Sequence, residues 1–288
     1  MAFIDSLKAT TVEFKDVDVV LNNVAFGDNV FVKVSGGSLS LSSAVMSGMD
    51  VSDTTIRFDG EAYFNNPESS SNNYPLRVSE SQIYQEKYDA HFEPNKLGGL
   101  VLINSRWSSS NAKMIFDTNL ENHNAIALLK NSFFIADDVN VSFLSGSNSV
   151  LPDDNILYVD ETSQVNMNKT SINVGDDTSS VILNNGSVFL KGTKINYFSD
   201  ANVAVTLGIG SELSLSNSLL GTSSNKSRYG VVDLGANFIS GKDSSIHSSI
   251  ECWHGSIFES TLSSIDGTSL ATTDFNKAFN KSIWSCNQ

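Results

Sequence analysis

The sequence predicts an all-β protein, a parallel β-helix (β-solenoid) with about 24 residues in each coil. Apolar positions recur every 24 residues from about Phe133 to Leu215, and turn residues separate them at matching places. Within each unit the apolar residues stand two apart, which is the period of a strand and not of a helix. The unit is too short for a propeller blade of about 40 to 45 residues and lacks the Leu and Asn pattern of leucine-rich repeats. Three columns carry the proposed register: Phe133, Leu157, Val181 and Val205; Ile135, Val159, Leu183 and Leu207; and Val141, Val165, Phe189 and Leu213.

Residues 1–60 are predicted to form a β region in which the 24-residue register cannot be followed. Apolar and polar residues alternate from Val12 to Leu41, and Asn-Asn, Asp-Asn and Gly-Gly pairs supply turns between short strands. Two interpretations stay open here: early coils of the same helix, or a separate small sheet. The regular parallel β-helix is expected over residues 97–267.

Two segments break the pattern. Residues 61–96 hold three of the four prolines, a run of Ser and Asn, and many of the aromatic residues, so they are predicted to be an excursion loop or a small insertion. Residues 268–288 are predicted to be a C-terminal cap, because Phe275, Phe279 and Ile283 are spaced by four as on one face of a helix. A cap is expected because the last coil of a solenoid would otherwise expose its core and its strand edges.

Charge and composition exclude several partners. The 18 basic and 32 acidic residues give a net charge of −14, which disfavours nucleic acid and anionic membranes as ligands. No run of 18 apolar residues is present, and the first residues lack the basic and apolar regions of a signal peptide. We therefore expect synthesis in a host cytoplasm. The two cysteines, Cys252 and Cys286, have no metal or redox spacing; two free thiols or one disulfide both remain open.

Acidic turns are the first candidate site. They comprise Asp153, Asp154, Asp176, Asp177 and Asp200, in which 153 and 177, and also 176 and 200, are 24 residues apart. On coils about 4.8 Å apart such carboxylates would approach the separation of roughly 5 to 5.5 Å that a retaining glycosidase uses. They could also bind Ca²⁺. Ordinary turns in which Asp bonds its own backbone explain the same residues more simply.

An aromatic cluster is the second candidate. It comprises Tyr63, Phe64, Tyr74, Tyr84, Tyr88 and Phe92, beside His91. It is interpreted either as apolar anchors of a loop, as a contact surface for a subunit or a capsid, or as a glycan platform. The four histidines lack zinc spacing, and motifs for a serine nucleophile or a phosphate loop are missing. The sequence therefore predicts neither an enzyme nor a cofactor, with Ca²⁺ as the one alternative.

The segments SQVNMNKTSI, GSVFLKGTKI and GSELSLSNSLL resemble right-handed parallel β-helices found in phage tailspikes, virion decoration proteins, pectate-lyase-like enzymes and bacterial adhesins. The resemblance implies a right-handed coil and covers about half of the chain. Adhesins and pectate lyases are normally secreted, whereas this sequence lacks the regions of a signal peptide. The resemblance therefore favours a virion surface protein, most concretely a phage capsid decoration or cement protein. Its expected partners are its own copies, as a homotrimer, and the major capsid protein. The alternatives are a tailspike that binds or cleaves host surface polysaccharide, and a cell-surface adhesin.

Overall fold

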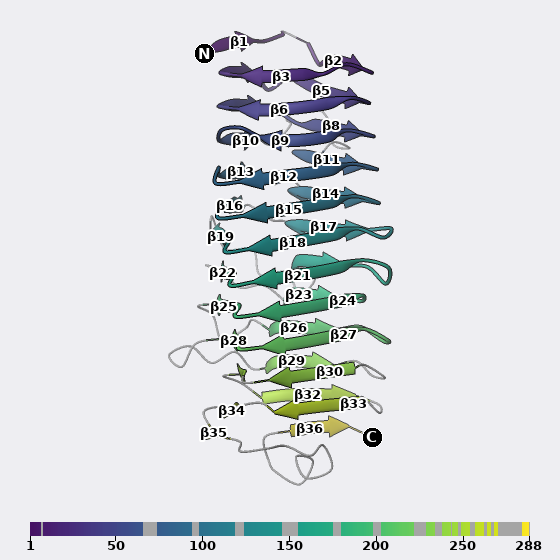
Figure 1. Ribbon diagram of the computed structural model, residues 1–288, viewed down its shortest axis with the longest axis vertical. Helices are drawn as coiled ribbons and strands as arrows, with labels where there is room; N and C mark the ends of the chain where they lie inside the picture. The colour runs from purple at the N-terminus through teal and green to yellow at the C-terminus, as the bar shows by residue number, and fades with distance from the viewer. Residues whose placement is uncertain are drawn as a thin grey trace.

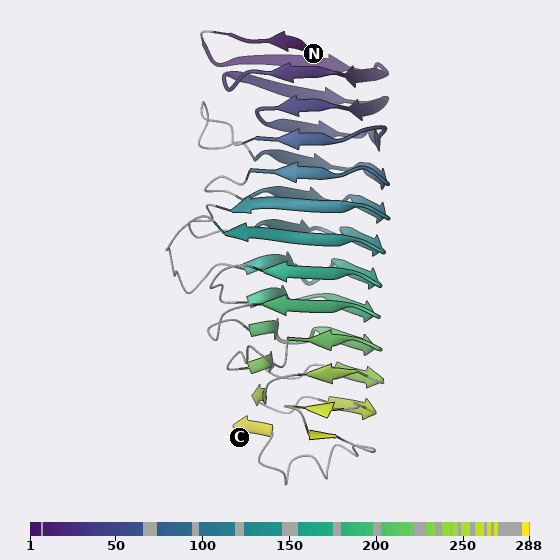
Figure 2. The same ribbon diagram turned by 90° about the vertical axis from the view of Figure 1, so that its left-hand side faces the viewer.

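The protein forms a continuous stack of β-coils (Figure 1). The computed structural model describes residues 1–6, 8–65, 74–93, 98–118, 124–145, 155–174, 180–197 and 203–221, and shorter pieces between 229 and 287. Three sheets, here named A, B and C, run along the stack, and from β1 to β34 the chain visits them in turn with one strand of each per coil. Figure 2 shows the same succession of coils from the side.

Sheet A contains β1 (Ala2–Ile4), β4 (Val24–Phe26), β7 (Ala44–Met46), β10 (Ala62–Phe64), β13 (Ala90–Phe92), β16 (Lys113–Thr118), β19 (Asn140–Ser145), β22 (Ser171–Val174), β25 (Lys194–Tyr197), β28 (Leu219–Leu220), β31 (Ser245–Ile246), β34 (Ser264–Ile265) and β35 (Thr268–Ser269). Sheet B contains β2 (Thr10–Lys15), β5 (Val30–Ser35), β8 (Met49–Ser52), β11 (Leu76–Ser79), β14 (Leu100–Ile103), β17 (Ile126–Leu129), β20 (Asn155–Val159), β23 (Ser180–Asn184), β26 (Val203–Leu207), β29 (Tyr229–Asp233), β32 (Ser249–Trp253) and β36 (Trp284–Asn287). Sheet C contains β3 (Val19–Asn22), β6 (Ser38–Ser42), β9 (Thr55–Phe58), β12 (Gln82–Glu86), β15 (Arg106–Ser110), β18 (Phe133–Asp137), β21 (Gln164–Asn168), β24 (Ser187–Lys191), β27 (Glu212–Ser216), β30 (Phe238–Lys242) and β33 (Ile257–Thr261).

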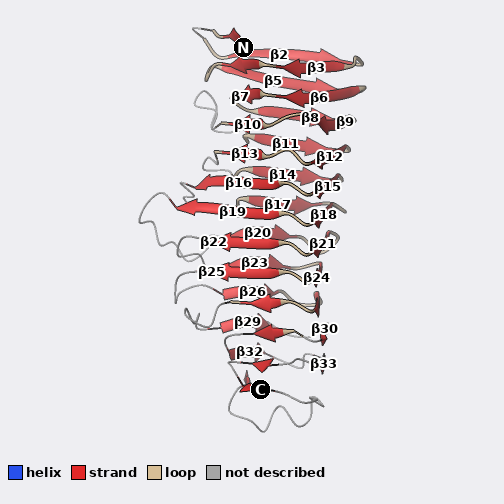
Figure 3. Ribbon diagram, turned by 60° about the vertical axis from the view of Figure 1, so that its left-hand side comes forward, coloured by secondary structure: helices blue, strands red, loops and turns tan. Residues whose placement is uncertain are grey.

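Strands of successive coils pair in parallel, and among the described strands only β34 and β35 pair antiparallel. Figure 3 shows strands and loops but no helix in the described part of the chain. Within those residues, then, no helix could span a bilayer. The architecture is the right-handed parallel β-helix that the sequence predicted, with the right-handed crossover that parallel strands almost always adopt.

Connection length varies little at two corners and widely at the third. Connections from sheet B to sheet C and from sheet C to sheet A span one to four residues. Connections from sheet A to sheet B range from two residues, between β7 and β8, to eleven, between β10 and β11, and fourteen, between β35 and β36. Insertions in this solenoid are therefore concentrated at the corner between sheets A and B.

The two short corners turn on residues in the left-handed backbone region. The φ angle is 48° at Asp53 and 47° at Asn104 in the corner from B to C, and 51° at Asn111 and 54° at Asp138 in the corner from C to A. Asn and Asp tolerate this region better than other residues with a side chain, because their short polar groups bond locally. Eight of the thirteen non-glycine residues with positive φ at these corners are Asn or Asp, which favours a turn there, while packing and the sheets impose the same conformation on the other five.

A ladder of buried hydroxyl groups links successive coils at the corner from B to C. Ser81 Oγ accepts the Thr54 N–H (3.0 Å), and Ser105 Oγ accepts the Ser81 N–H (3.1 Å). Ser132 Oγ then accepts the Ser105 N–H (3.2 Å), and Ser163 Oγ accepts the Ser132 N–H (3.0 Å). Several of these hydroxyls also donate to a carbonyl of their own coil. Because a buried N–H without a partner is costly, the ladder satisfies groups that the sheets leave unpaired at the corner.

The core fills the interior of the stack without a break. On sheet A, Phe64, Phe92, Phe116 and Phe143 stack face to face, with ring centroids 5.0, 4.7 and 5.0 Å apart. Trp107 of sheet C is fully buried against this stack, and its Nε1–H donates to Gln85 at 3.2 Å. Offset aromatic stacking of this kind adds to the hydrophobic contribution of each ring.

The structure resolves the open question about residues 1–60 and corrects the prediction for residues 61–96. Strands β1 to β9 are early coils of the same helix, each paired in register with the next. In residues 61–96, β10 to β13 are coil strands as well, so the predicted excursion is wrong for these residues. The polar run that suggested it belongs to the eleven-residue connection between β10 and β11, of which 66–73 lie outside the described residues.

The predicted columns also need correction. Leu157 pairs with Ile126 and Ile182, and Ile182 pairs with Val205, so successive steps are 31, 25 and 23 residues. Phe133 pairs with Gln164 on sheet C and does not belong to the Leu157 column. A period of 24 is thus close to the mean of unequal coils, and a slip of one residue places a side chain on the opposite face.

The other two predicted columns fail for the same reason. Ile135 lies on sheet C, and Asn184 stands where Leu183 was expected, between Val159 and Leu207; the buried Asn184 side chain bonds the Gly186 N–H. In the third column Val165 and Leu213 both pair with Val188 instead of Phe189, and Val141 lies on sheet A.

The C-terminal cap is described only in part. The helix predicted from Phe275, Phe279 and Ile283 lies outside the described residues. Strand β36, inside the predicted cap, pairs in parallel with β32 and so extends sheet B.

Replacing Leu213 with Asp should destroy cooperative folding, because Leu213 is fully buried and an unpaired charge inside the stack destabilises by about 4 kcal/mol or more. Ile209→Asp is the matched control, since Ile209 lies four residues earlier and is 77% exposed. Urea unfolding of both variants checks this. A soluble Leu213→Asp protein with a cooperative transition near that of the control would contradict the register.

Replacing Ser132 with Ala should lower the free energy of unfolding by about 1–3 kcal/mol, since the Ser105 N–H loses its buried acceptor. Ser110→Ala, on the outer face of sheet C, should change the stability by less than about 0.5 kcal/mol. Denaturant titration of the two variants measures the difference. Equal stabilities would show that the ladder contributes nothing.

Candidate functional sites

The acidic turns fall in connections from sheet A to sheet B. Asp153, Asp154, Asp176, Asp177 and Asp200 all lie outside the described residues. Their stacking, and the glycosidase and Ca²⁺ hypotheses built on it, stay predictions. Among the residues that the structure does describe, there is no group of three or more His, Cys, Asp or Glu side chains placed to hold a metal ion.

The predicted aromatic cluster does not form one surface. Phe64 and Phe92 point inward and belong to the core stack, whereas Tyr63, next to Phe64, lies on the outer face of sheet A. Tyr84 lies on the outer face of sheet C, 41% exposed, with the Arg57 guanidinium 5.7 Å from its ring centroid. The remaining members, Tyr74 and Tyr88, lie outside strands, and Tyr88 is exposed in the corner from C to A.

A row of half-buried side chains remains on sheet A. Val45, Tyr63, His91 and Ile115 occupy the same register position on β7, β10, β13 and β16. The Tyr63 and His91 rings stack with centroids 4.4 Å apart. The Tyr63 hydroxyl donates to Glu61 at 3.0 Å, and this hydrogen bond, with burial and the negative charge of Glu61, raises the pKa of Tyr63. We call these four residues the sheet A row; of them the sequence interpretation had included Tyr63, and it had placed His91 beside the cluster.

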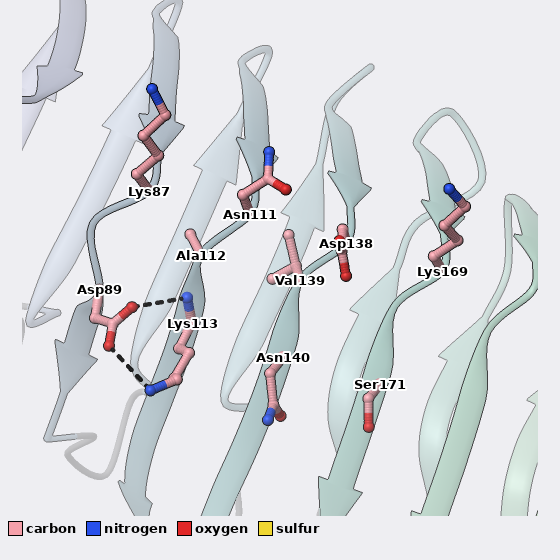
Figure 4. A pocket seen from close by; sticks show the side chains of 10 residues that line it. All are labelled: Lys87, Asp89, Asn111, Ala112, Lys113, Asp138, Val139, Asn140, Lys169 and Ser171. Carbon is pink, nitrogen blue, oxygen red and sulfur yellow. Dashed lines mark hydrogen bonds and ion pairs between the residues drawn. The ribbon is translucent and has the colours of Figure 1, made fainter.

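A shallow polar groove of about 560 Å³ follows the corner from C to A (Figure 4). Asp89 holds Lys113 of the next coil twice: its Oδ1 accepts the Lys113 N–H at 3.0 Å, and Oδ2 lies 3.7 Å from Nζ. Lys87 and Lys169 project at either end in Figure 4. The lining residues are Lys87, Asp89, Asn111, Ala112, Lys113, Asp138, Val139, Asn140, Lys169 and Ser171.

Sequence reasoning missed this groove. The sequence does contain the pattern that builds the groove, because a polar residue follows each strand of sheet C, either directly or two positions later. Coils of unequal length hide that recurrence from a search at a fixed period. The groove offers amides, carboxylates and ammonium groups, which suit a polar ligand such as a saccharide.

Asp160 organises the corner after β20. Its carboxylate accepts the Lys130 N–H at 2.6 Å and both the N–H and the hydroxyl of Thr162, at 3.1 and 3.0 Å. Burial acts to raise the pKa of Asp160, but the hydrogen bonds from Ser163, Lys130 and Thr162 outweigh it and lower the pKa. The same residue lines a second shallow groove, with Tyr158 beside it. These contacts give Asp160 a structural role, since they hold the backbone of the preceding coil.

Five of the eight large hydrophobic residues exposed in the described part of the chain lie at the N-terminal end of the stack. Phe3 and Val20 are 68% and 69% exposed, and Met1, Ile4 and Val17 are also among the exposed large hydrophobic residues. Exposed apolar patches at a strand edge are typical of interaction sites. The sequence identified strands in this region but could not show that their outer edge is open.

Comparison with known proteins adds no family: no family model, no curated protein and no solved structure matches this chain.

Replacing Asp160 with Asn should lower stability at neutral pH, on the order of 1 kcal/mol for a partly exposed group, because the ionised acceptor is lost. Because the pKa of Asp160 is lower in the folded than in the unfolded state, its ionised carboxylate stabilises the folded protein at pH values above the unfolded-state pKa. This stabilisation is lost as the pH falls through the folded-state pKa. The gap between wild type and variant should therefore shrink in acid. Urea titrations from neutral to acidic pH test this, and a constant gap would contradict it.

Proposed function

We propose that this protein is a non-enzymatic structural component of a virus particle surface, most concretely a phage capsid decoration or cement protein. In this proposal it is made in a host cytoplasm, acts at the virion surface and has the major capsid protein as its partner. The proposal rests on the resemblance of the repeat segments to virion β-helices and on the mechanical character of the fold.

The observation that carries the proposal is the linkage between coils. Parallel ladders join successive coils in three sheets from β1 to β33, and Ser hydroxyl groups add buried hydrogen bonds at a corner. Solenoids couple each unit mainly to its neighbours, so unbroken coupling along the axis makes a stiff rod. A stiff rod suits a protein that holds shell subunits at a fixed distance.

The mechanism would be clamping. A protein that binds the assembled shell but not its separated subunits raises the free energy of their separation by mass action. We place the shell contact at the sheet A row, where Tyr63 and His91 offer a stacked pair of rings and Val45 and Ile115 extend the apolar strip. Aromatic residues with a polar edge are frequent anchors in such interfaces. The trimer expected from the sequence would gain avidity from three such contacts.

The test is co-sedimentation with capsid particles that lack this protein. The wild type should bind saturably, and Ile115→Ser should weaken binding by at least tenfold. Ile135→Ser is the matched control, because Ile135 is also half-buried but lies on the outer face of sheet C. Loss of binding in both variants, or in neither, would contradict the placement; no binding by the wild type would contradict the function.

A second candidate is a tailspike that binds or cleaves host surface polysaccharide, and the groove in Figure 4 is the observation that favours it. In that case Asp89→Asn together with Lys113→Gln should reduce polysaccharide binding, while Asp153→Asn with Asp177→Asn should abolish release of sugar ends. Polysaccharide binding without particle binding would replace the decoration protein with the tailspike.

A further inference from the structure

Among the strands that the structure describes, those of the N-terminal coil have one edge each without a paired strand. Strands β1, β2 and β3 are the terminal strands of sheets A, B and C. On β5, Val32 and Val34 are buried, whereas their partners on β2, Val12 and Phe14, are only partly buried although they pack against the same core. The interior of the stack is therefore open at this end, and something must cover it for the core to be complete.

The charges on β2 indicate what covers it. Glu13 and Lys15 lie on the outer face of this strand, exposed, one residue to either side of Phe14. A strand with an acidic and a basic residue placed symmetrically about an apolar centre is complementary to an antiparallel copy of itself. We propose that a second copy of this chain covers the open end, so that two solenoids join head to head about a two-fold axis.

The register of this contact follows from the charges. If Phe14 lies on the two-fold axis, Phe14 faces its own copy inside the joined core, and each Glu13 faces a Lys15 on the outer face. Facing residues of antiparallel strands lie on the same side of the sheet and interact directly. Centring the contact on Glu13 instead would oppose two carboxylates, which is destabilising.

The same axis pairs the other two edges. A two-fold axis through β2 exchanges sheets A and C, so β1 would meet β3 of the other copy. This arrangement brings the exposed Phe3 and Val20 to the junction, on the outer faces of sheets A and C, where they would shield each other in part. Two-fold contacts of this kind are self-complementary and closed, so they stop at two copies.

Charge exchange tests the proposal. The wild type should contain an even number of chains by sedimentation velocity: two, or six if copies also associate side by side as trimers. Glu13→Lys and Lys15→Glu each place like charges opposite one another and should weaken the association by about tenfold or more. Lys87→Glu, an exposed change at a distant corner, should leave it unchanged.

Mixing the two single variants is the decisive step. A Glu13→Lys chain and a Lys15→Glu chain are complementary to each other, so the mixture should recover pairing that neither shows alone. The double variant should pair with itself like the wild type. Thermal melting of each variant alone checks its folding, which matters because Glu13→Lys also places a lysine beside Lys33 of the next coil.

An odd number of chains in the wild type, or single variants that pair as well as the wild type, would overturn the proposal. So would a failure of the mixture to recover pairing when both variants are folded. The inference does not rest on the proposed function, because no capsid particle or polysaccharide enters the experiment.

Discussion

Buried backbone N–H groups at the corners are the constraint on which this solenoid depends. Within the sheets each N–H finds a carbonyl on a neighbouring coil, but a chain that turns through about a third of a circle must interrupt that ladder. At the corner from B to C a Ser hydroxyl of the following coil takes over as acceptor, as Ser105 does for Ser81. This acceptor sits one coil step away in each case, and corners of two to four residues accommodate it, as the bond from the Ser132 N–H to Ser163 Oγ shows. The connection from A to B has room to vary, and there the lengths do vary.

The difference between two short corners and one corner of variable length explains how much of the fold the sequence could predict. Alternating apolar residues and a repeat of about two dozen residues were sufficient for the strands, the parallel stack and the fold class. The register was not predictable at a fixed period, because the steps from Leu157 to Ile182 and from Ile182 to Val205 differ by two residues. Corner pairs such as Asn104-Ser105, a left-handed residue followed by a buried hydroxyl, are better markers of register than the distance between apolar residues.

The candidate sites show the same limit. Tyr63 and Phe64 are adjacent in the sequence, yet one lies on the surface and the other in the core, because successive strand residues point to opposite faces. Composition could therefore find an aromatic segment but not separate its contact residues from its core residues. The sheet A row exists only once β7, β10, β13 and β16 are placed side by side, at unequal distances along the chain.

A regular core also creates a problem at its ends. Each interior coil is covered on both sides by coils of similar structure. A surface that covers a terminal coil must therefore offer strand edges and apolar side chains at the positions where a further coil would place them. For the N-terminal end the best available imitation is another N-terminal coil, since it presents the same three edges and the same apolar spacing in reversed order. Glu13 and Lys15 make that match selective, whereas apolar area alone would accept any strand. Because the two-fold axis exchanges sheets A and C, two stiff rods joined in this way would carry their identical sheet A rows on different faces, one in each half of the pair. A head-to-head pair would thus offer two equal contacts at a fixed separation, each to a different surface.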